Sequence, residues 1–148
     1  NKSRVVAGYC YDWVTKHNSD PNLFDICLEK GFKARWNFNN TKTWAIDEKS
    51  IDQIGCIHTC QGLEFNYVGV IIGKDLIYKD DMVMTDFTKR AKTDQSLKGI
   101  KTTKNFSLAD TIIRNTYRTL MSRGQKGCYV YCEDKELAEY IKWIIINK

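Results

Sequence analysis

The residue types best suited to chemistry lie together in one short segment, residues 57–65, which reads Ile-His-Thr-Cys-Gln-Gly-Leu-Glu-Phe. Gly62 allows a close approach to the backbone or a positive φ, which other residues adopt less readily. Gln61 and Thr59 are able to orient a water molecule or a phosphate, and Glu64 is able to accept a hydrogen bond from a ribose hydroxyl. The segment therefore has the groups of a nucleotide-binding loop, although an ordinary turn before a helix has a similar composition.

Apolar runs on either side predict the strands that position this segment. Residues 4–9, 54–58 and 67–72 are mainly apolar without alternation, a pattern typical of strands that are buried on both faces of a parallel sheet. Ligands of open α/β sheets bind at the carboxyl ends of the strands. Since the polar segment begins where the second of these runs ends, we expect it to lie at that edge of the sheet.

The C-terminal third of the chain predicts a helix, a strand and a second helix. Ser107 followed by Asp110 indicates a capping box, and the helix that it opens has an apolar stripe that continues to Met121. Residues 128–132 form an apolar run that predicts a buried strand. Asp134 then caps a last helix, whose predicted apolar stripe consists of Leu137, Tyr140, Ile141, Ile144 and Ile145.

This alternation of strands and helices predicts an α/β fold, with an open and mainly parallel sheet and flanking helices. Leu76–Tyr78 and Met82–Met84 flank a polar Lys-Asp-Asp turn and predict a β-hairpin insertion. The chain has no internal repeat and no linker, so we expect residues 1–148 to form a single domain.

The composition excludes several classes of protein. The chain has 148 residues, 43% of them hydrophobic and 28% charged, with one proline and nine glycines, so it is neither disordered nor collagen-like. No apolar stretch approaches the ~20 residues of a membrane-spanning helix, and no leader opens the chain, so we expect a cytoplasmic protein without a membrane partner. Because the chain begins without methionine, we expect it to be part of a longer protein.

The net charge of +5 is concentrated in one segment. Between residues 89 and 104 the chain has one acid, Asp94, and six basic residues, namely Lys89, Arg90, Lys92, Lys98, Lys101 and Lys104. Basic side chains that neutralise phosphates release counterions, so Lys98 and Lys101 are candidate contacts to nucleic acid. A solvated surface loop is the alternative interpretation of such a charge run.

The cysteines and the large aromatic residues each leave two interpretations open. Cys56 with Cys60 and Cys128 with Cys132 would form a zinc site if neighbouring strands brought the pairs together, although the spacing lacks the Cys-x2-Cys turn of zinc knuckles. We expect reduced, buried thiols and no metal. Four aromatic residues would either stack on bases or pack in the core, namely Trp13, Trp36, Phe38 and Trp44.

Two blocks of sequence resemble motifs of a known enzyme class. Residues 57–68 resemble motif V of superfamily-one helicases, in which Gly-Leu-Glu-Phe leads into a strand. Residues 119–124, Thr-Leu-Met-Ser-Arg-Gly, resemble the core of motif VI, with glycine where alanine is usual. Residues 52–132 as a whole are similar to the schlafen group 3-like DNA/RNA helicase family, a group of largely uncharacterised bacterial proteins. The resemblance implies the second, C-terminal RecA-like domain of a helicase-type ATPase.

The resemblance also implies roles for individual residues in a nucleotide site. Arg123 matches the motif VI arginine, which reaches across an interdomain cleft to the γ-phosphate and stabilises charge in the transition state. Glu64 matches the glutamate that binds the ribose, and Gly62 matches the glycine near the phosphates. Gln61 occupies the preceding Lys/Gln position of the motif.

On the same resemblance, His58 and Thr59 match positions that couple the nucleotide to the backbone of single-stranded DNA or RNA. The sequence contains neither a Gly-x-x-x-x-Gly-Lys-(Ser/Thr) phosphate loop nor an acidic motif for magnesium. We therefore expect ATP and Mg²⁺ to bind only together with an N-terminal RecA-like domain of the same protein, and this chain alone to be inactive. The alternative is a non-catalytic module that binds nucleic acid or protein, and a zinc-stabilised structural domain is a third hypothesis.

Overall fold

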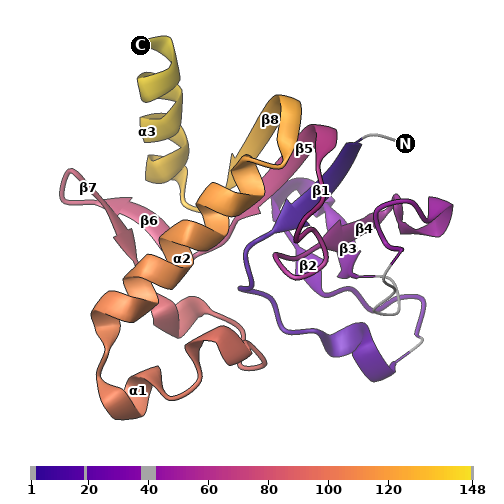
Figure 1. Ribbon diagram of the computed structural model, residues 1–148, viewed down its shortest axis with the longest axis horizontal. Coiled ribbons are helices and arrows are strands. Elements are labelled where there is room, and N and C mark those ends of the chain that lie inside the picture. The colour runs from indigo at the N-terminus through magenta and orange to yellow at the C-terminus, as the bar shows by residue number, and fades with distance from the viewer. Residues whose placement is uncertain (1–2, 19, 38–42, 148) are drawn as a thin grey trace.

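The structure is a computed structural model that describes residues 3–18, 20–37 and 43–147. Its main element is a six-stranded sheet (Figure 1). The strand order is β2-β3-β4-β1-β5-β8. β2 pairs with β3 in antiparallel fashion, and every other pair of neighbours is parallel. The strands are β1 (Ser3–Ala7), β2 (Ile26–Cys27), β3 (Lys33–Trp36), β4 (Gln53–Gly55), β5 (Phe65–Ile72) and β8 (Gly124–Cys132). The predicted α/β class is confirmed, and the arrangement is compatible with a RecA-like domain.

The remaining elements flank this sheet. The predicted hairpin is present as β6 (Leu76–Lys79) and β7 (Met82–Thr85), and its turn is closed by Asp80 and Asp81 at positive φ. The α-helices are α1 (Ile100–Thr103), α2 (Phe106–Met121) and α3 (Lys135–Ile146). Short 3-10 turns cover Val14–His17, Glu29–Gly31, Glu48–Ser50, Phe87–Lys89 and Gln95–Leu97. Within the described residues, none of the helices is both long enough and apolar enough to cross a membrane.

Helix α2 differs from its prediction at its start and in its buried face. Its N-cap is Asn105, whose Oδ1 accepts a hydrogen bond from the backbone N–H of Leu108 at 3.2 Å, so the capping box predicted at Ser107 is wrong. Leu108, placed on the apolar stripe by the sequence, is 45% exposed. The buried residues of α2 are Ala109, Ile113, Thr116, Tyr117 and Leu120. The burial of the small Ala109 and the polar Thr116 is a packing effect that hydrophobic spacing does not reveal.

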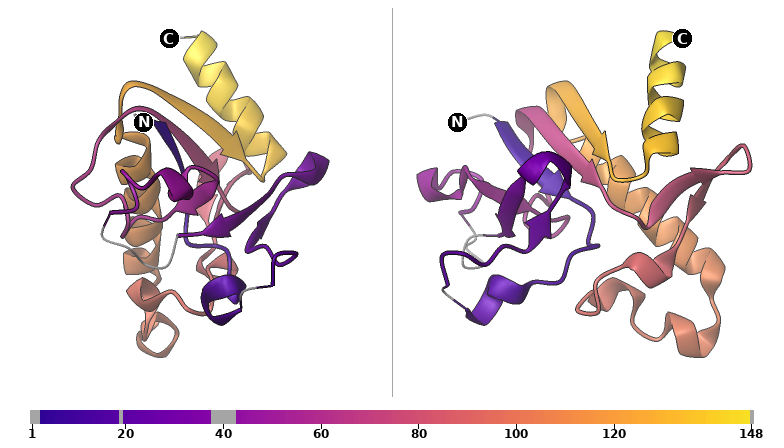
Figure 2. Two further views of the ribbon diagram at one scale, coloured as in Figure 1. Left: turned by 90° about the vertical axis from the view of Figure 1, so that its right-hand side faces the viewer. Right: turned by 180° about the vertical axis from the view of Figure 1, so that it is seen from behind.

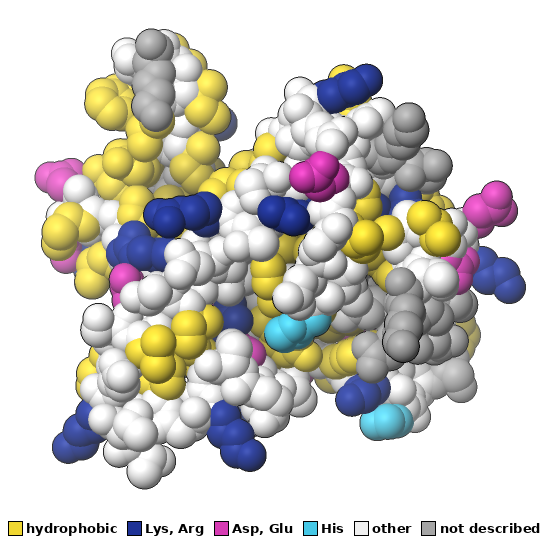
Figure 3. Space-filling view, in the orientation of Figure 1, with side chains coloured by type: hydrophobic (Ala, Val, Ile, Leu, Met, Phe, Trp, Pro, Cys, Tyr) yellow, Lys and Arg dark blue, Asp and Glu magenta, His cyan; other side chains and the backbone are white. Residues whose placement is uncertain are grey.

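Helix α3 begins as predicted but is much less buried. Asp134 caps it by accepting a hydrogen bond from the N–H of Leu137 at 2.7 Å, and Leu137 is fully buried. Beyond this first turn the helix leaves the sheet beside the hairpin, where Tyr78 and Tyr140 stack with their ring centroids 4.2 Å apart. Ile145, which was predicted on the buried stripe, is exposed, as are Trp143 and Ile146. Figure 3 shows the resulting column of apolar side chains over α3.

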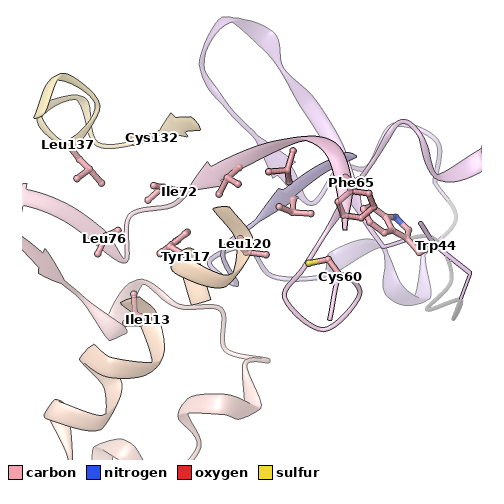
Figure 4. Close-up of a cluster of buried hydrophobic side chains, with 13 residues drawn as sticks. Trp44, Cys60, Phe65, Ile72, Leu76, Ile113, Tyr117, Leu120, Cys132 and Leu137 are labelled. Carbon is pink, nitrogen blue, oxygen red and sulfur yellow. The ribbon is translucent and has the colours of Figure 1, made fainter. Parts of the chain in front are cut away.

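The main hydrophobic core lies between the sheet and α2 (Figure 4). Val68, Val70 and Ile72 of β5 face the helix, because alternate residues of a strand point to the same side. Ile113, Tyr117 and Leu120 of α2 meet them, and Trp44, Cys60 and Phe65 extend the cluster past the amino end of β5. At ~1.5–3 kcal/mol for each fully buried large aliphatic side chain, this cluster is the main source of stability on this face.

The opposite face of the sheet carries a smaller core. It contains Ala7 of β1 and Ile71 of β5 together with Ile26, Ala34, Trp36, Ile54 and Cys56 from the β2–β3–β4 side. No helix covers this face along β5 and β8 in the described part of the chain, and from behind these two strands lie in front of α2 (Figure 2, right).

A buried polar network joins the carboxyl ends of the central strands to α2. Asp75, which follows β5 and is fully buried, accepts hydrogen bonds from the Tyr117 hydroxyl and, at 3.1 Å, from Arg90. The Nε of Arg90 also donates to Asp94 at 2.7 Å. The Tyr117 hydroxyl in turn accepts a hydrogen bond from the N–H of Gly73 at 3.0 Å. The network ties residues 73–75, 90–94 and α2 into one unit.

Arg90 is therefore not a surface residue of the basic segment, and the sequence interpretation that grouped it with the neighbouring lysines is wrong. Burial by itself lowers the pKa of Arg90, but the carboxylates of Asp94 and Asp75 outweigh that effect, so its pKa lies above the ordinary value. A buried charge persists only when it is paired, and two carboxylates here hold one guanidinium.

Replacing Arg90 by alanine should lower the free energy of unfolding by about 3–5 kcal/mol, because Asp75 and Asp94 would remain buried without their cation. Urea unfolding measures the change. Arg118→Ala is the matched control, since Arg118 lies exposed on α2 and its loss should change stability by less than about 0.5 kcal/mol. A loss below about 1 kcal/mol for Arg90→Ala would show that the network does not depend on this pair.

Candidate functional site

The segment that resembles motif V crosses from one edge of the sheet to the other. The strand predicted over residues 54–58 ends at Gly55, so this prediction is wrong at residues 56–58. Residues 56–60 instead form a helical turn, in which the N–H of Cys60 donates to the carbonyl of Cys56 at 3.2 Å. The side chain of Cys60 is anchored in the main core. His58 and Thr59 therefore lie near the carboxyl end of β4, as expected, whereas Gly62 and Glu64 lie at the amino end of β5.

At the amino ends of β5 and β8 the two motif-like blocks meet. The backbone N–H of Phe65 donates to the carbonyl of Arg123 at 2.8 Å, which starts the pairing of the two strands. The guanidinium of Arg123 donates to the carbonyl of Leu63 at 3.4 Å and to that of Thr119 at 3.1 Å. Arg123 is thus partly buried and is held against the block that contains Gly62 and Glu64.

The acidic side chain of this cluster is exposed. Glu64 accepts a hydrogen bond from the side-chain amide of Gln125 at 2.5 Å. Both residues line a hollow of about 310 Å³, which Ala45 and Ile46 also line. Gln125 is a site residue that the sequence analysis did not single out, although it lies in the block that follows Arg123. The available signal was its position two residues after Arg123, next to the block that resembles motif VI.

Gly62 meets the conformational requirement that its type suggested. Its φ is +73°, in the left-handed region that costs other residues about 1–2 kcal/mol, and no atom lies within 4 Å of the position that a Cβ would occupy. Gln61 beside it is also exposed. The backbone at this turn is therefore open to a ligand.

His58 and Thr59 have different environments at the carboxyl edge. His58 is exposed and its ring lies edge-on to Tyr9, with the centroids 6.1 Å apart. The hydroxyl of Thr59 accepts a hydrogen bond from the N–H of Cys56 at 2.8 Å and lies 2.9 Å from its carbonyl, so it stabilises the turn. Tyr9 also stacks on Trp36 at 5.7 Å, and no sequence signal had marked it as a site residue.

The basic segment is attached to this same edge. The N–H of Ala91 donates to the carbonyl of Tyr9 at 2.9 Å, and the N–H of Lys92 donates to Asp12 at 3.0 Å. Lys98 is exposed. The side chain of Lys101 lies outside the described residues.

The predicted stacking aromatics are mostly structural. Trp36 and Trp44 are buried, which assigns them to packing. Trp13 is half-buried with the ammonium of Lys16 over its ring, and Phe38 lies outside the described residues.

Comparison with known proteins identifies the family. Residues 1–134 match the family model described as "Schlafen group 3, DNA/RNA helicase domain". The chain belongs to this family. It is also 33% identical, over 124 residues, to the uncharacterized protein YPL245W of Saccharomyces cerevisiae, in an alignment that covers 78% of this chain and 27% of the yeast protein. The schlafen-type chain thus spans about a quarter of that relative's length. No solved structure matches it.

The cysteines of the schlafen-type domain do not form the zinc site that was considered as an alternative. Among the described residues no three His, Cys, Asp or Glu side chains come together as metal ligands. Cys56, Cys60 and Cys132 are buried, whereas Cys128 is exposed. Burial raises the pKa of the Cys60 thiol to about 12 and that of Cys132 to about 11, so these thiols stay protonated and unreactive near neutral pH.

Alkylation of the native protein with iodoacetamide at pH 8 should therefore modify Cys27 and Cys128, the two exposed thiols, well before the other four. Mass spectrometry of tryptic peptides measures the order of reaction, and the denatured protein, in which every thiol reacts, is the control. Protection of Cys128 that is lost on adding a chelator, together with stoichiometric zinc by elemental analysis, would contradict this assignment.

Proposed function

We propose that this chain is the second, C-terminal RecA-like domain of an ATP-dependent DNA or RNA helicase or translocase. Its membership of a family described as a DNA/RNA helicase domain supports a helicase-like role in nucleic-acid metabolism. In this proposal the domain contributes one wall of an ATP site between two domains, and it has no ATPase activity by itself. The other wall, with the phosphate loop and the magnesium ligands, belongs to an N-terminal RecA-like domain.

The contact between Arg123 and the Gly62–Glu64 block is the observation that carries the proposal. Residues 60 positions apart in sequence are joined through the Arg123 guanidinium and the Leu63 carbonyl. A nucleotide site needs a cation for phosphate and a hydrogen-bond acceptor for ribose close together. Arg123 and Glu64 supply these two groups at the starts of adjacent strands.

The environment of Arg123 suits an arginine finger. Its hydrogen bonds go to backbone carbonyls and to the Ser122 hydroxyl, and within the described ranges it forms no ion pair with a carboxylate. Its positive charge is therefore not neutralised, in contrast to that of Arg90. A preorganised, unneutralised guanidinium stabilises the charge that develops on a transferring phosphoryl group.

The other residues of the block fit the same ligand. Gly62, with Gln61, presents an open turn for a close approach to phosphate, and exposed Glu64 can accept from a ribose hydroxyl while Gln125 orients its carboxylate. When bound, ATP with Mg²⁺ would supply the hydrolysable phosphoanhydride. Closure of the two domains would then bring Arg123 to the phosphate, so hydrolysis would depend on domain movement.

In the same proposal the single strand binds along the carboxyl edge. His58, Thr59 and Lys98, together with Lys101, are the residues that we assign to the nucleic acid. Exposed His58 lies beside Tyr9, and the carbonyl of Tyr9 accepts a hydrogen bond from the N–H of Ala91 in the basic segment. We therefore assign the histidine and the basic segment to one edge. Thr59 acts there by holding the turn that presents His58.

Arg123→Ala in the full-length protein should lower nucleic-acid-stimulated ATP hydrolysis by about 10³-fold or more, because the transition state would lose the cation that stabilises its developing charge. A steady-state phosphate-release assay, with and without single-stranded DNA or RNA, measures the effect. Arg118→Ala is the control, since Arg118 lies exposed on α2, before the turn that holds Arg123, and its loss should leave the rate unchanged.

Two results of that assay would overturn the motor proposal. They are a hydrolysis rate that does not respond to Arg123→Ala, and a rate of zero in the folded wild-type protein under every condition. Either result would favour a non-catalytic module that binds nucleic acid or protein. Unfolding curves of the two arginine variants separate loss of function from loss of structure.

Lys98→Ala should weaken binding of single strands of any sequence and reduce the slope of log affinity against log salt by about 1, as expected for one lost phosphate contact. Fluorescence anisotropy over a series of salt concentrations measures this slope. Lys142→Ala on α3 is the control, because Lys142 is exposed and already paired with Glu139. An unchanged slope for Lys98→Ala would remove this residue from the binding surface.

A further inference from the structure

The uncovered face of the sheet carries tyrosines at the positions that a helix normally covers. On β5 and β8, Tyr67, Tyr129 and Tyr131 point away from α2, because their neighbours Val68, Val70 and Cys132 belong to the core under the helix. The exposed fractions of these tyrosines are 42%, 69% and 40%. The tyrosines form one surface, since Tyr67 and Tyr129 lie with ring centroids 6.3 Å apart. We call these three residues the tyrosine face.

Glycines alternate with the tyrosines, and the ring of Tyr67 lies over Gly127. Gly69 is the register partner of both Tyr129 on β8 and Val5 on β1, and Gly127 is the partner of Tyr67. A hollow of about 580 Å³ lies over this part of the sheet, between Val5, the loop 28–32 and residues 129–131. Flat ligands therefore have access to Tyr129 and Tyr131 from this side of the sheet.

The composition of this face is not that of a surface buried under a helix. Strands covered on both faces are rich in Val, Ile and Leu, as the α2 side of β5 is here. The tyrosine face has instead exposed aromatic rings with polar tips. Tyrosine suits an interface that is apolar at one end and wet at the other.

The charges around the tyrosine face favour an anionic ligand. Glu29 is paired with Lys135 at 3.4 Å, and Glu133 is paired with Lys74 at 3.9 Å, so the two nearby acids are neutralised. Lys30 lines the hollow and takes part in none of the ion pairs of the described residues. The rim is therefore net positive.

We propose that the tyrosine face is a second binding surface for single-stranded nucleic acid, on which bases stack against Tyr67, Tyr129 and Tyr131 while Lys30 contacts phosphate. Aromatic side chains on adjacent strands of an open sheet stack bases without sequence preference, because every base has a π-face. This surface is separate from the edge that holds His58 and Lys98, and it involves neither Arg123 nor the nucleotide.

The test compares Tyr129→Phe with Tyr129→Leu, and then the same pair of changes at Tyr67, in the full-length protein. Phenylalanine keeps the ring, whereas leucine keeps an apolar side chain of similar exposure and removes stacking. Fluorescein-labelled oligothymidylate and oligouridylate are the probes, read by anisotropy. Each leucine variant should bind at least about fivefold more weakly, and each phenylalanine variant within about twofold of wild type.

Three further readouts make the result unambiguous. Equal weakening for both probes indicates stacking on bases shared by DNA and RNA, and weakening for one probe assigns the face to that polymer. Ultraviolet crosslinking of oligothymidylate should yield adducts on these tyrosines in wild type. Arg123→Ala should abolish stimulated hydrolysis without changing these affinities, so a failure of the motor proposal and a failure of this one give different results.

Equal affinities of the leucine and phenylalanine variants would overturn the proposal. It would also fail if the leucine variants altered self-association or the retention of a protein partner while oligonucleotide binding stayed the same, because the face would then dock protein. Unfolding midpoints close to wild type, expected at a residue as exposed as Tyr129, establish that the comparison is made between folded proteins.

Discussion

The arrangement of this domain depends on a single buried cation and the two carboxylates that hold it. Arg90 joins Asp75, at the carboxyl end of β5, to Asp94 in the following segment, and Asp75 also holds Tyr117 of α2. Because these charges are buried, they are stable only together. The network therefore fixes the long connection between the hairpin and α2 against the sheet, and it fixes the register of α2 over β5.

The same constraint determines what the two edges of the sheet can do. With the connection held at the carboxyl edge, Ala91 pairs with the backbone of Tyr9 and Lys92 with Asp12, so the start of the basic segment lies on the side where β1 and β4 end. The amino edge is left to the short crossover and to the end of α2. The side chain of Cys60 is buried in the main core and anchors the segment that runs between the two edges. A segment of few residues thus links the residues that we propose for nucleic acid with those that we propose for the nucleotide.

Much of this fold is predictable from sequence, for physical reasons that vary by element. The continuous apolar run of β5 and the cap at Asp134 are local signals, and both predictions are confirmed. Ser107 and Asn105 are both good cap residues, and the choice between them depends on which face of α2 the sheet buries. The sequence grouped Arg90 with the neighbouring lysines as part of a basic segment, because no local pattern shows that Asp75 and Asp94 pair with it in the core. The sequence placed the candidate residues in one segment after a strand, but their division between two edges depends on the turn that begins at Cys56, where hydrophobicity predicted a strand as far as His58.

The two outer strands of the sheet differ in a way that affects handling of the protein. β2, at one end, is two residues long, which is a common protection against unwanted pairing. β8, at the other end, is nine residues long and has a partner on one side only in the described chain. Its outer row of amides and carbonyls is a template for another strand. Crowded or concentrated solutions of this domain are therefore prone to edge-to-edge aggregation, and a single outward lysine or proline on β8 is the simplest way to keep such a preparation monodisperse.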